Sequence, residues 1–176
     1  MNLKQLSNEF YNRNTITVAK ELLGKIIICK KYDKAKACRI VETEAYLIGD
    51  PASHSYKGQT KRNQSMFKGP GTLYVYTIHR QSCMNIVTKK GEAVLIRAAE
   101  PLCNINKPTN GPGKLCAALG ITRIEDDGKN VINSDITIVD DGWKPQSIEC
   151  SKRIGVTKAK DSLLRFYIKG NKYVSR

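Results

Sequence analysis

The sequence contains few of the side chains from which metal sites and disulfide frameworks are built. Only two histidines occur, His54 and His79, and the six cysteines include no C-x-x-C pair. Neither histidine lies near a paired cysteine or histidine, so we expect no metal site. In a chain of this length such cysteines are typical of free, mostly buried thiols. Disulfides are the alternative.

Long apolar segments are also missing. Residues 1–14 are polar and lack the continuous apolar stretch of a signal peptide. Later apolar runs, such as the three isoleucines at positions 26–28, are far shorter than a membrane span. We therefore expect no segment embedded in a membrane, and a cytoplasmic location in a bacterium or a nuclear one in a eukaryote.

Acidic residues are scarce, since 16 Asp and Glu stand against 30 Lys and Arg, which gives a net charge of +14. Such an excess disfavours the compact state through self-repulsion and is typical of a protein with a polyanionic partner. Nucleic acid is the first candidate and an anionic membrane surface the second. With 176 residues, of which 40% are hydrophobic and 26% charged, the chain suits one soluble globular domain.

Hydrophobic periodicity and turn residues predict a mixed α and β domain in which strands predominate. We expect helices over residues 3–11, 15–23 and 114–119, with Gly24 and Gly120 ending the second and third. We expect strands over residues 25–30, 37–47, 72–78, 83–88, 93–98, 136–139, 148–151 and 163–169. The three strands between 72 and 98 form a meander whose turns are residues 79–82 and 89–92. Residues 49–70 are predicted as a long polar loop of the kind that is functional or disordered.

One strand and one hairpin carry an acid, aromatic rings and an amide. Glu44 and Tyr46 are two residues apart and therefore project from the same side of a strand. The hairpin offers Tyr74 and Tyr76 on one face, followed by Asn85. A pocket that clamps a planar base and acts on it needs such groups. Alternatively, the tyrosines are half-buried sheet residues and the acid is solvated or paired with arginine. The alternation also does not distinguish Glu44 from Glu42, which lies on the same side of the strand.

Residues 111–115, Gly-Pro-Gly-Lys-Leu, do not complete a nucleotide-binding loop. That loop needs glycine where Pro108 stands and Ser or Thr where Leu115 stands, so we expect neither ATP nor GTP and no cofactor. A helix that begins after two glycines, with Lys114 in its first turn, can still hold one phosphate. Alternatively, Lys114 is an ordinary exposed lysine.

The chain resembles the 3-methyladenine (alkyladenine) DNA glycosylase family in a collinear series of segments that covers nearly its whole length. The first is Arg39-Ile40-Val41-Glu42-Thr43-Glu44-Ala45-Tyr46-Leu47, which resembles the family's signature strand. The others are ASHS at 52–55, TKRN at 60–63, MF at 66–67, PGTLYVY at 70–76, CMNI at 83–86, VLIRAAEP at 94–101, GPGKL at 111–115, RIGV at 153–156 and RFY at 165–167. No single short motif carries the resemblance.

This resemblance implies a monofunctional glycosylase of base-excision repair that acts as a monomer on double-stranded DNA containing damaged purines. Such an enzyme flips an alkylated or deaminated purine into its pocket, at a cost of roughly a few kcal/mol. It then hydrolyses the N-glycosidic bond and leaves an abasic site. Glu44 corresponds to the general base that activates water. Arg97 and the carbonyl of Ile154 correspond to groups that hold that water.

The resemblance also assigns a fold and the groups that bind the base. It implies a single α+β domain with a curved, mostly antiparallel sheet, packed helices and a hairpin at 74–87 that projects toward DNA. The base lies between Tyr46 and Tyr76, with the His54 ring on its other side and the His54 amide near its edge. Asn85 corresponds to the side chain that excludes the exocyclic amine of normal guanine.

DNA phosphates are assigned to Lys61, Arg62 and Lys114, which implies strongly salt-dependent binding. Many family members carry a wedge tyrosine in the turn that follows position 78, whereas this turn is one residue shorter and has His79 in that place. Either His79 fills the gap left by the flipped nucleotide while Arg80 grips phosphate, or the turn is only a tight hairpin.

Two other functions remain open at this stage. A catalytically silent binder of distorted or damaged DNA is suggested by the altered turn. A basic RNA-binding or ribosome-associated protein is supported by charge alone, because no RNA-binding signature occurs.

Overall fold

The computed structural model describes residues 3–31 and 33–175 of the chain. Its strands are β1 (Lys4–Gln5), β2 (Ile26–Cys29), β3 (Lys36–Tyr46), β4 (Leu73–Ile78), β5 (Gln81–Lys89), β6 (Glu92–Cys103), β7 (Ile136–Asp140), β8 (Ile148–Ser151) and β9 (Arg165–Ile168). Its helices are α1 (Asn8–Tyr11), α2 (Thr15–Glu21), the 3-10 helix η1 (Gln64–Phe67), α3 (Pro112–Leu119) and α4 (Arg123–Asp126). None of these helices has the length and apolar character needed to cross a membrane.

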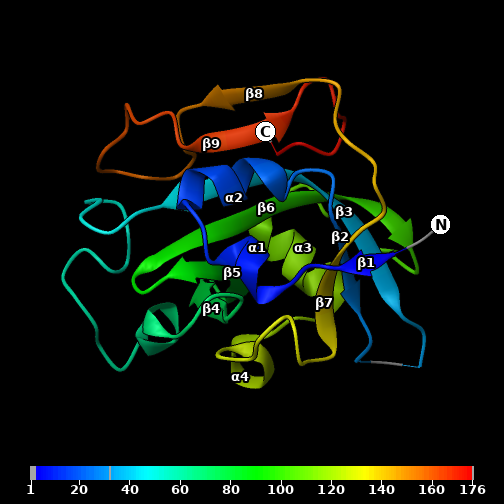
Figure 1. Cartoon of the computed structure of the whole chain (residues 1–176), viewed down its shortest axis with the longest axis horizontal. Helices are drawn as coiled ribbons and strands as arrows, with labels where there is room; N and C mark the ends of the chain where they lie inside the picture. The colour runs from blue at the N-terminus through cyan, green and yellow to red at the C-terminus, as the bar shows by residue number, and fades with distance from the viewer. Residues whose placement is uncertain (1–2, 32, 176) are drawn as a thin grey trace.

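The strands form one open antiparallel sheet, as predicted for a mixed α+β domain. Its strand order is β1-β7-β2-β3-β6-β5-β4, and β9 joins it by pairing with both β3 and β8. Helix α2 lies between the main sheet and the β8–β9 pair in Figure 1. The sheet thus brings segments that are far apart in the sequence around one central strand, β3.

Strand β3 has different neighbours along its length. Its first residues pair with β2, whereas the residues from Glu42 to Glu44 lie between β6 and β9. A register shift against β6 falls between Ile40 and Glu42, where one residue of β3 is left unpaired. Strands thus flank this part of β3 on both edges, and Glu42 and Glu44 on it are fully buried.

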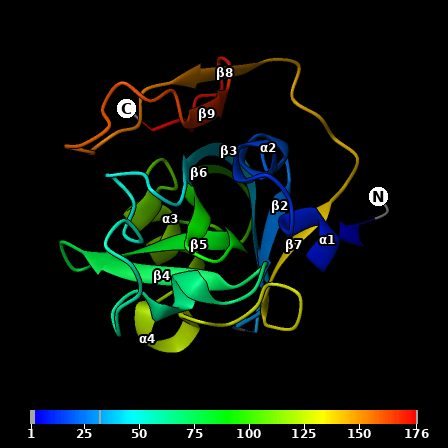
Figure 2. The same cartoon turned by 60° about the vertical axis from the view of Figure 1, so that its left-hand side comes forward.

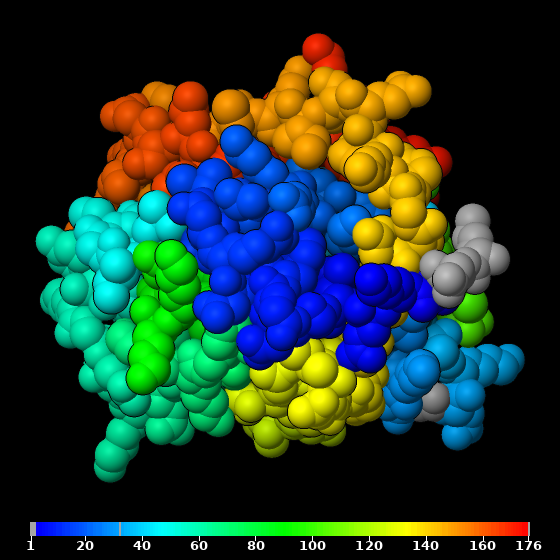
Figure 3. Space-filling model, viewed as in Figure 1, coloured from blue at the N-terminus to red at the C-terminus, as the bar shows by residue number. Residues whose placement is uncertain are grey.

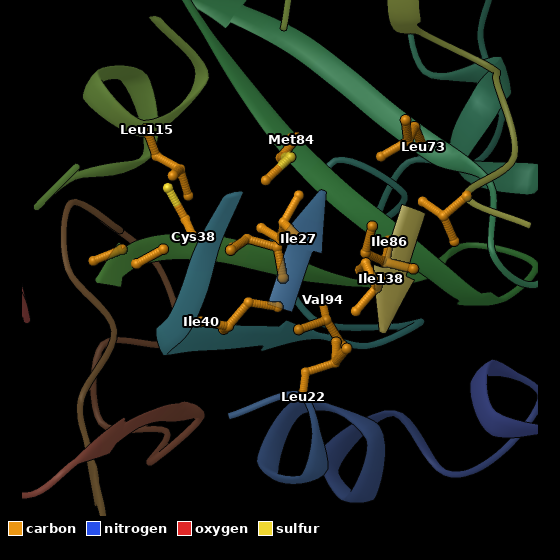
Figure 4. Close-up of a cluster of buried hydrophobic side chains, with 14 of the residues drawn as sticks. Leu22, Ile27, Cys38, Ile40, Leu73, Met84, Ile86, Val94, Leu115 and Ile138 are labelled. Carbon is orange, nitrogen blue, oxygen red and sulfur yellow. The ribbon is translucent and has the colours of Figure 1, made fainter. Parts of the chain in front are cut away.

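The apolar core lies on the face of the sheet that α2 and α3 also contact. Side chains from β2, β3, β5 and β6 meet there, as Figure 4 shows for Ile27, Ile40, Met84 and Val94. Leu115 of α3 and Leu22, which follows α2, are buried in the same cluster. This core makes β3 and β6 a rigid base for the polar groups that they carry.

The predictions from the sequence are wrong or missing for three short elements. The expected helix over 3–11 begins only at Asn8, because the residues before it form β1 and pair with β7. Helix α4 was not expected, although Thr122 caps it by accepting a hydrogen bond from the Glu125 amide, a recognisable capping pattern. The long loop at 49–70 contains η1.

Strands β4 and β5 form a hairpin that projects from the body of the molecule (Figure 2). Ile78 pairs with Gln81, so the turn consists of His79 and Arg80 alone. The prediction of a four-residue turn at 79–82 is therefore wrong, because its last two residues belong to β5. His79 and Arg80 have φ angles of 46° and 64°, the left-handed region that a two-residue turn of this kind demands.

All six cysteines are free thiols, as the sequence predicted. Four are buried, and Cys103 and Cys150 are exposed. Among the described residues, no three His, Cys, Asp or Glu side chains are grouped so that they could hold a metal ion.

Candidate active site

A cavity of about 500 Å³ opens where the end of β3 meets the β4–β5 hairpin and two loops. Four strands contribute Tyr46, Tyr74, Tyr76, Cys83, Asn85, Leu95 and Arg97. The loop after β3 contributes residues 51–54, and the loop between β8 and β9 contributes residues 154–158. Figures 1 and 2 show these two loops, in cyan and orange, on the same side of the molecule. One cavity therefore collects all the residues assigned to base binding.

Three aromatic rings cluster on one wall of this cavity. The ring centroid of His54 lies 4.6 Å from that of Tyr76 and 6.0 Å from that of Tyr74, edge-on in both cases. Nδ1 of His54 and the hydroxyl of Tyr74 share a hydrogen bond of 2.8 Å. The side-chain amide of Asn63 donates to the His54 carbonyl at 2.9 Å. The loop after β3 is thus tied to β4, and the imidazole is held in place.

The imidazole of His54 is also held in its neutral form. Burial, and then the positive charge of Arg62, lowers the pKa of His54 below its ordinary value of 6.5. The ring is therefore uncharged at pH 7. Because it is uncharged, it does not repel a positively charged ligand in the cavity.

Glu44 lies directly behind the cavity wall and is fully buried. The backbone N–H of Ile154 donates to its Oε1 at 2.8 Å, and the hydroxyl of Tyr46 donates to its Oε2 at 2.8 Å. Nη1 of Arg97 lies 3.4 Å from Oε1. All three residues that hold this carboxylate line the cavity. The resemblance assigns the carbonyl of Ile154 to this site, whereas the contact to Glu44 is made by its amide.

The Glu44 carboxylate keeps acceptor capacity for a further group. A carboxylate has about four lone-pair sites, and only one hydrogen bond reaches Oε2. Burial, and then the charge of Glu44, raises the pKa of Tyr46 well above its usual range, so its hydroxyl remains a donor. Oε2 therefore has acceptor capacity that its hydrogen bond with Tyr46 does not use.

A second glutamate on β3 anchors Arg97. Glu42 is fully buried, and its Oε1 accepts hydrogen bonds from Nε of Arg97 at 3.1 Å and from Nε of Arg165 at 2.6 Å. The amide and hydroxyl of Ser175 donate to Oε2 and Oε1 of Glu42 at 2.7 Å and 2.8 Å. Arg97 thus bridges Glu42 and Glu44. Two carboxylates and two guanidinium groups balance in charge, as burial of ions requires.

Asn85 is held rigidly at the cavity wall. It faces Tyr74 across the hairpin, and its side-chain nitrogen donates to the Tyr74 carbonyl at 3.0 Å. Asn85 is also buried, with 4% of its surface exposed. A side chain held in this way cannot turn aside without losing a buried hydrogen bond.

The residues assigned to DNA binding lie on the hairpin and in the loop after β3. His79 and Arg80 form the exposed hairpin tip, and Lys61 is exposed in the loop. Arg62 lines a second cavity of about 450 Å³ next to the first, to which Lys57 also contributes. Their roles as DNA contacts stay predictions.

Lys114 belongs to the helix that contacts the same hairpin next to its turn. It occupies the first turn of α3, is exposed, and its Nζ lies 3.3 Å from Oδ1 of Asn110. The start of α3 packs against the hairpin so closely that a Cβ on Gly113 would lie 2.0 Å from Oε1 of Gln81. Glycine is thus required there, and the choice between phosphate binding and plain exposure stays open for Lys114.

Four residues of the site were not predicted from the sequence: Asp50, Arg153, Arg165 and Ser175. Arg153 and Arg165 fall within segments of the family resemblance, but no pattern assigns them a partner. Asp50 and Arg153 form a buried ion pair across 103 positions of sequence. Only the folded chain brings such groups together, so no local signal could have identified them.

The chain is similar to known proteins over nearly its whole length. The family model described as Methylpurine-DNA glycosylase (MPG) matches residues 9–172. A protein of Methanoculleus marisnigri is 43% identical over 187 residues, which cover 95% of this chain and 96% of that protein. A protein of Clostridium novyi is 43% identical over 203 residues, covering 99% and 100%. One from Francisella tularensis is 42% identical over 182 residues, covering 92% and 94%. All three carry the provisional name 3-methyladenine DNA glycosylase.

The substitution Glu42→Gln should destabilise the fold. The change leaves two buried guanidinium groups with one carboxylate between them, a loss of about 3–5 kcal/mol in the free energy of unfolding. Chemical denaturation measures it. The control is Glu149→Gln, which removes an exposed carboxylate from β8 and should change stability little. Equal losses in the two variants would contradict the anchoring role of Glu42.

The pKa of His54 provides a test of the cavity's electrostatics. NMR titration should place it below 6.5, and Arg62→Gln should raise it, because the second cause of the lowering is removed. Burial remains in the variant, so the pKa should still stay below the ordinary value. Lys61→Gln removes the same charge from the neighbouring position and should have the smaller effect. A larger effect from Lys61→Gln would refute the assignment.

Proposed function

Because the chain belongs to the methylpurine-DNA glycosylase family, we propose that it excises alkylated or deaminated purines from duplex DNA. It hydrolyses the N-glycosidic bond and leaves an abasic site, without a strand-cleaving step. The observation that carries this proposal is the placement of Glu44 behind a cavity with aromatic walls. The cavity is complete within one chain, so a monomer suffices.

The first step is removal of the damaged nucleotide from the duplex. Unstacking and unpairing cost roughly a few kcal/mol. The cavity of about 500 Å³ lies within the usual size range of ligand sites. Tyr46 stacks on one face of the base, with Tyr76 and His54 on the other side. Stacking on aromatic side chains contributes about 1–3 kcal/mol per base and offsets part of the cost.

In the chemical step, Glu44 takes a proton from a water molecule at the cavity wall. The water oxygen attacks C1′ of the deoxyribose, and the electron pair of the N-glycosidic bond moves to the departing base. The carboxylate also stabilises the oxocarbenium character of the sugar in the transition state. Purines alkylated at N3 or N7 already carry a positive charge, so they leave as neutral bases without an acid. One carboxylate is therefore enough for these substrates.

The neighbours of Glu44 orient it for this task. The Ile154 amide and Arg97 engage Oε1, which directs the less occupied Oε2 toward the water. The Tyr46 hydroxyl donates to Oε2, so the ring that stacks on the base also touches the group that activates water. Seating of the base and orientation of the carboxylate are thereby connected through one side chain.

Selection among purines depends on the rest of the wall. The fixed amide of Asn85 crowds the exocyclic amine of guanine and so keeps the normal base out. The neutral ring of His54 accepts alkylated purine cations without charge repulsion. Both properties favour a damaged base over an undamaged one.

The surface around the cavity supplies the contacts to DNA. A net charge of +14 favours binding to the phosphate backbone. His79 and Arg80 adopt positive φ angles although neither is glycine or asparagine. Such strained positions cluster where a side chain has a function. We assign His79 to the gap left by the flipped nucleotide, and Arg80 to phosphate.

The substitution Glu44→Gln should abolish base release while DNA binding persists. It keeps the shape of the side chain but cannot accept a proton, so release of 3-methyladenine or hypoxanthine should fall by about 10²-fold or more. Free-base release and affinity for the same lesion-bearing duplexes are measured side by side.

Glu149→Gln, on the exposed strand β8, is the matched control and should keep full activity. Retention of activity by Glu44→Gln would remove this residue from the mechanism. Failure of the unaltered protein to release any base would favour a binder of damaged DNA without catalysis.

Replacement of His79 and Arg80 by asparagine and glycine should separate stability from activity. These residues suit a two-residue turn, so the free energy of unfolding should rise by about 1–2 kcal/mol. Base release should slow, and the salt dependence of DNA binding should decrease by about one phosphate contact. Lys4→Gln, at the other edge of the sheet, is the charge-matched control. Unchanged activity in the double variant would show that the turn is only a connection.

A further inference from the structure

A buried ion pair connects the two loops that wall the cavity. Asp50 lies in the loop after β3, and Arg153 directly precedes Ile154 in the loop between β8 and β9. Arg153 has no exposed side-chain surface, and Asp50 has 7%. Nη2 of Arg153 donates to Oδ1 of Asp50 at 3.0 Å, and Nη1 donates to its Oδ2. Figure 3 shows the two loops adjacent at the surface, the orange one above the cyan one.

The same guanidinium group lies against the ring of Tyr46. Cζ of Arg153 is 4.6 Å from the ring centroid, and Nη1 also donates to the Ala45 carbonyl at 3.0 Å. Nε of Arg153 is buried and finds no hydrogen-bond partner among the described residues. The guanidinium therefore gives up one hydrogen bond in the position that the ring and Asp50 impose. Such a dehydrated cation is tolerated where it is paired and stacked.

These contacts converge on the groups that the proposed function uses. Tyr46 is held on one face by Arg153 and at its hydroxyl by Glu44. The residue after Arg153, Ile154, donates its amide to the same carboxylate. One ion pair thus fixes both the stacking surface and a ligand of the water-activating group.

We propose that the Asp50–Arg153 pair positions Tyr46 and determines which charge of base this ring accepts. The inference rests on the proposed function. Arg153 supplies a rigid backing for the ring. Asp50 cancels the charge of that backing, so a positively charged purine can stack on the opposite face.

The physical basis is the short distance between the backing and the base. An aromatic face attracts cations, but a second, uncompensated cation behind the ring repels a cationic base through a water-poor medium. A neutral base experiences no such net repulsion. Burial alone would raise the pKa of Asp50, but the hydrogen bonds from Arg153 and the Ala52 amide outweigh it, and the pKa is lowered. Asp50 is therefore ionised at neutral pH and provides the compensation.

The test compares a cationic and a neutral lesion in the same duplex. Affinities for duplexes with 3-methyladenine, which is cationic in the nucleotide, or with neutral hypoxanthine are measured by fluorescence anisotropy at fixed salt, in a Glu44→Gln background that prevents cleavage. Neither base carries the 2-amino group of guanine that Asn85 excludes. Asp50→Asn keeps the shape and leaves Arg153 uncompensated. It should weaken binding of the 3-methyladenine duplex by about tenfold more than binding of the hypoxanthine duplex. Arg153→Met leaves an anion behind the ring and should shift the ratio of affinities in the opposite direction.

A purely structural clamp would change both affinities by the same factor, and that result, in either single variant, overturns the proposal. If one variant does not fold, the other still decides, because the two shifts have opposite signs. Asp50→Glu retains the charge and should keep the ratio within about threefold of the unaltered protein. Asp161→Asn breaks the exposed Lys152–Asp161 pair in the same loop and should change nothing. Failure of the proposed function would appear separately, as absence of base release by the protein that retains Glu44.

Discussion

The site depends on keeping two carboxylates buried side by side on one strand. Arg97 makes this possible, because its Nε binds Glu42 and its Nη1 lies 3.4 Å from Glu44. Without it, like charges at this spacing would repel each other in a medium that screens poorly. Arg165 and Ser175 complete the shell of Glu42, which leaves Glu44 as the member of the pair that faces the cavity wall. The cluster therefore gives two similar acids different surroundings: Glu42 anchors Arg97, and Glu44 is held against the cavity wall.

The difference between Glu42 and Glu44 could not be predicted from the sequence pattern alone. Period-two alternation places Glu42 and Glu44 on one face of a strand, and it gives no reason to prefer either. The distinction comes from β9, the chain near Ser175 and the loop at 154, which reach β3 from more than a hundred positions away. The family resemblance pointed to Glu44, and the fold distinguishes the two acids: Tyr46, Ile154 and Arg97, which contact Glu44, all line the cavity, whereas Arg165 and Ser175, which bind Glu42, do not.

The fold was predictable where local chemistry dominates. Alternating residues and short turns predicted β4, β5 and β6, and Gly120, with a φ angle of 77°, ends α3 as expected. The prediction was wrong where tertiary pairing overrides local preference. Lys4 and Gln5 pair with β7 at the edge of the sheet and do not extend α1 toward the N-terminus. The Gln5 side chain also donates hydrogen bonds to the carbonyls of Val131 and Ile132. The conformational preference of two residues is too weak to outweigh pairing with a neighbouring strand.

The cavity itself is a tertiary property, and its geometry explains why aromatic rings and polar clamps occur together. A ring at a cavity wall has neighbours on one side only. Two of the tyrosine rings are fixed there by polar contacts: Tyr74 through His54, and Tyr46 through Glu44 and Arg153. The same two rings also pack in a small apolar cluster around Met66. The polar network beneath the cavity and this apolar packing together give the cavity walls a defined shape.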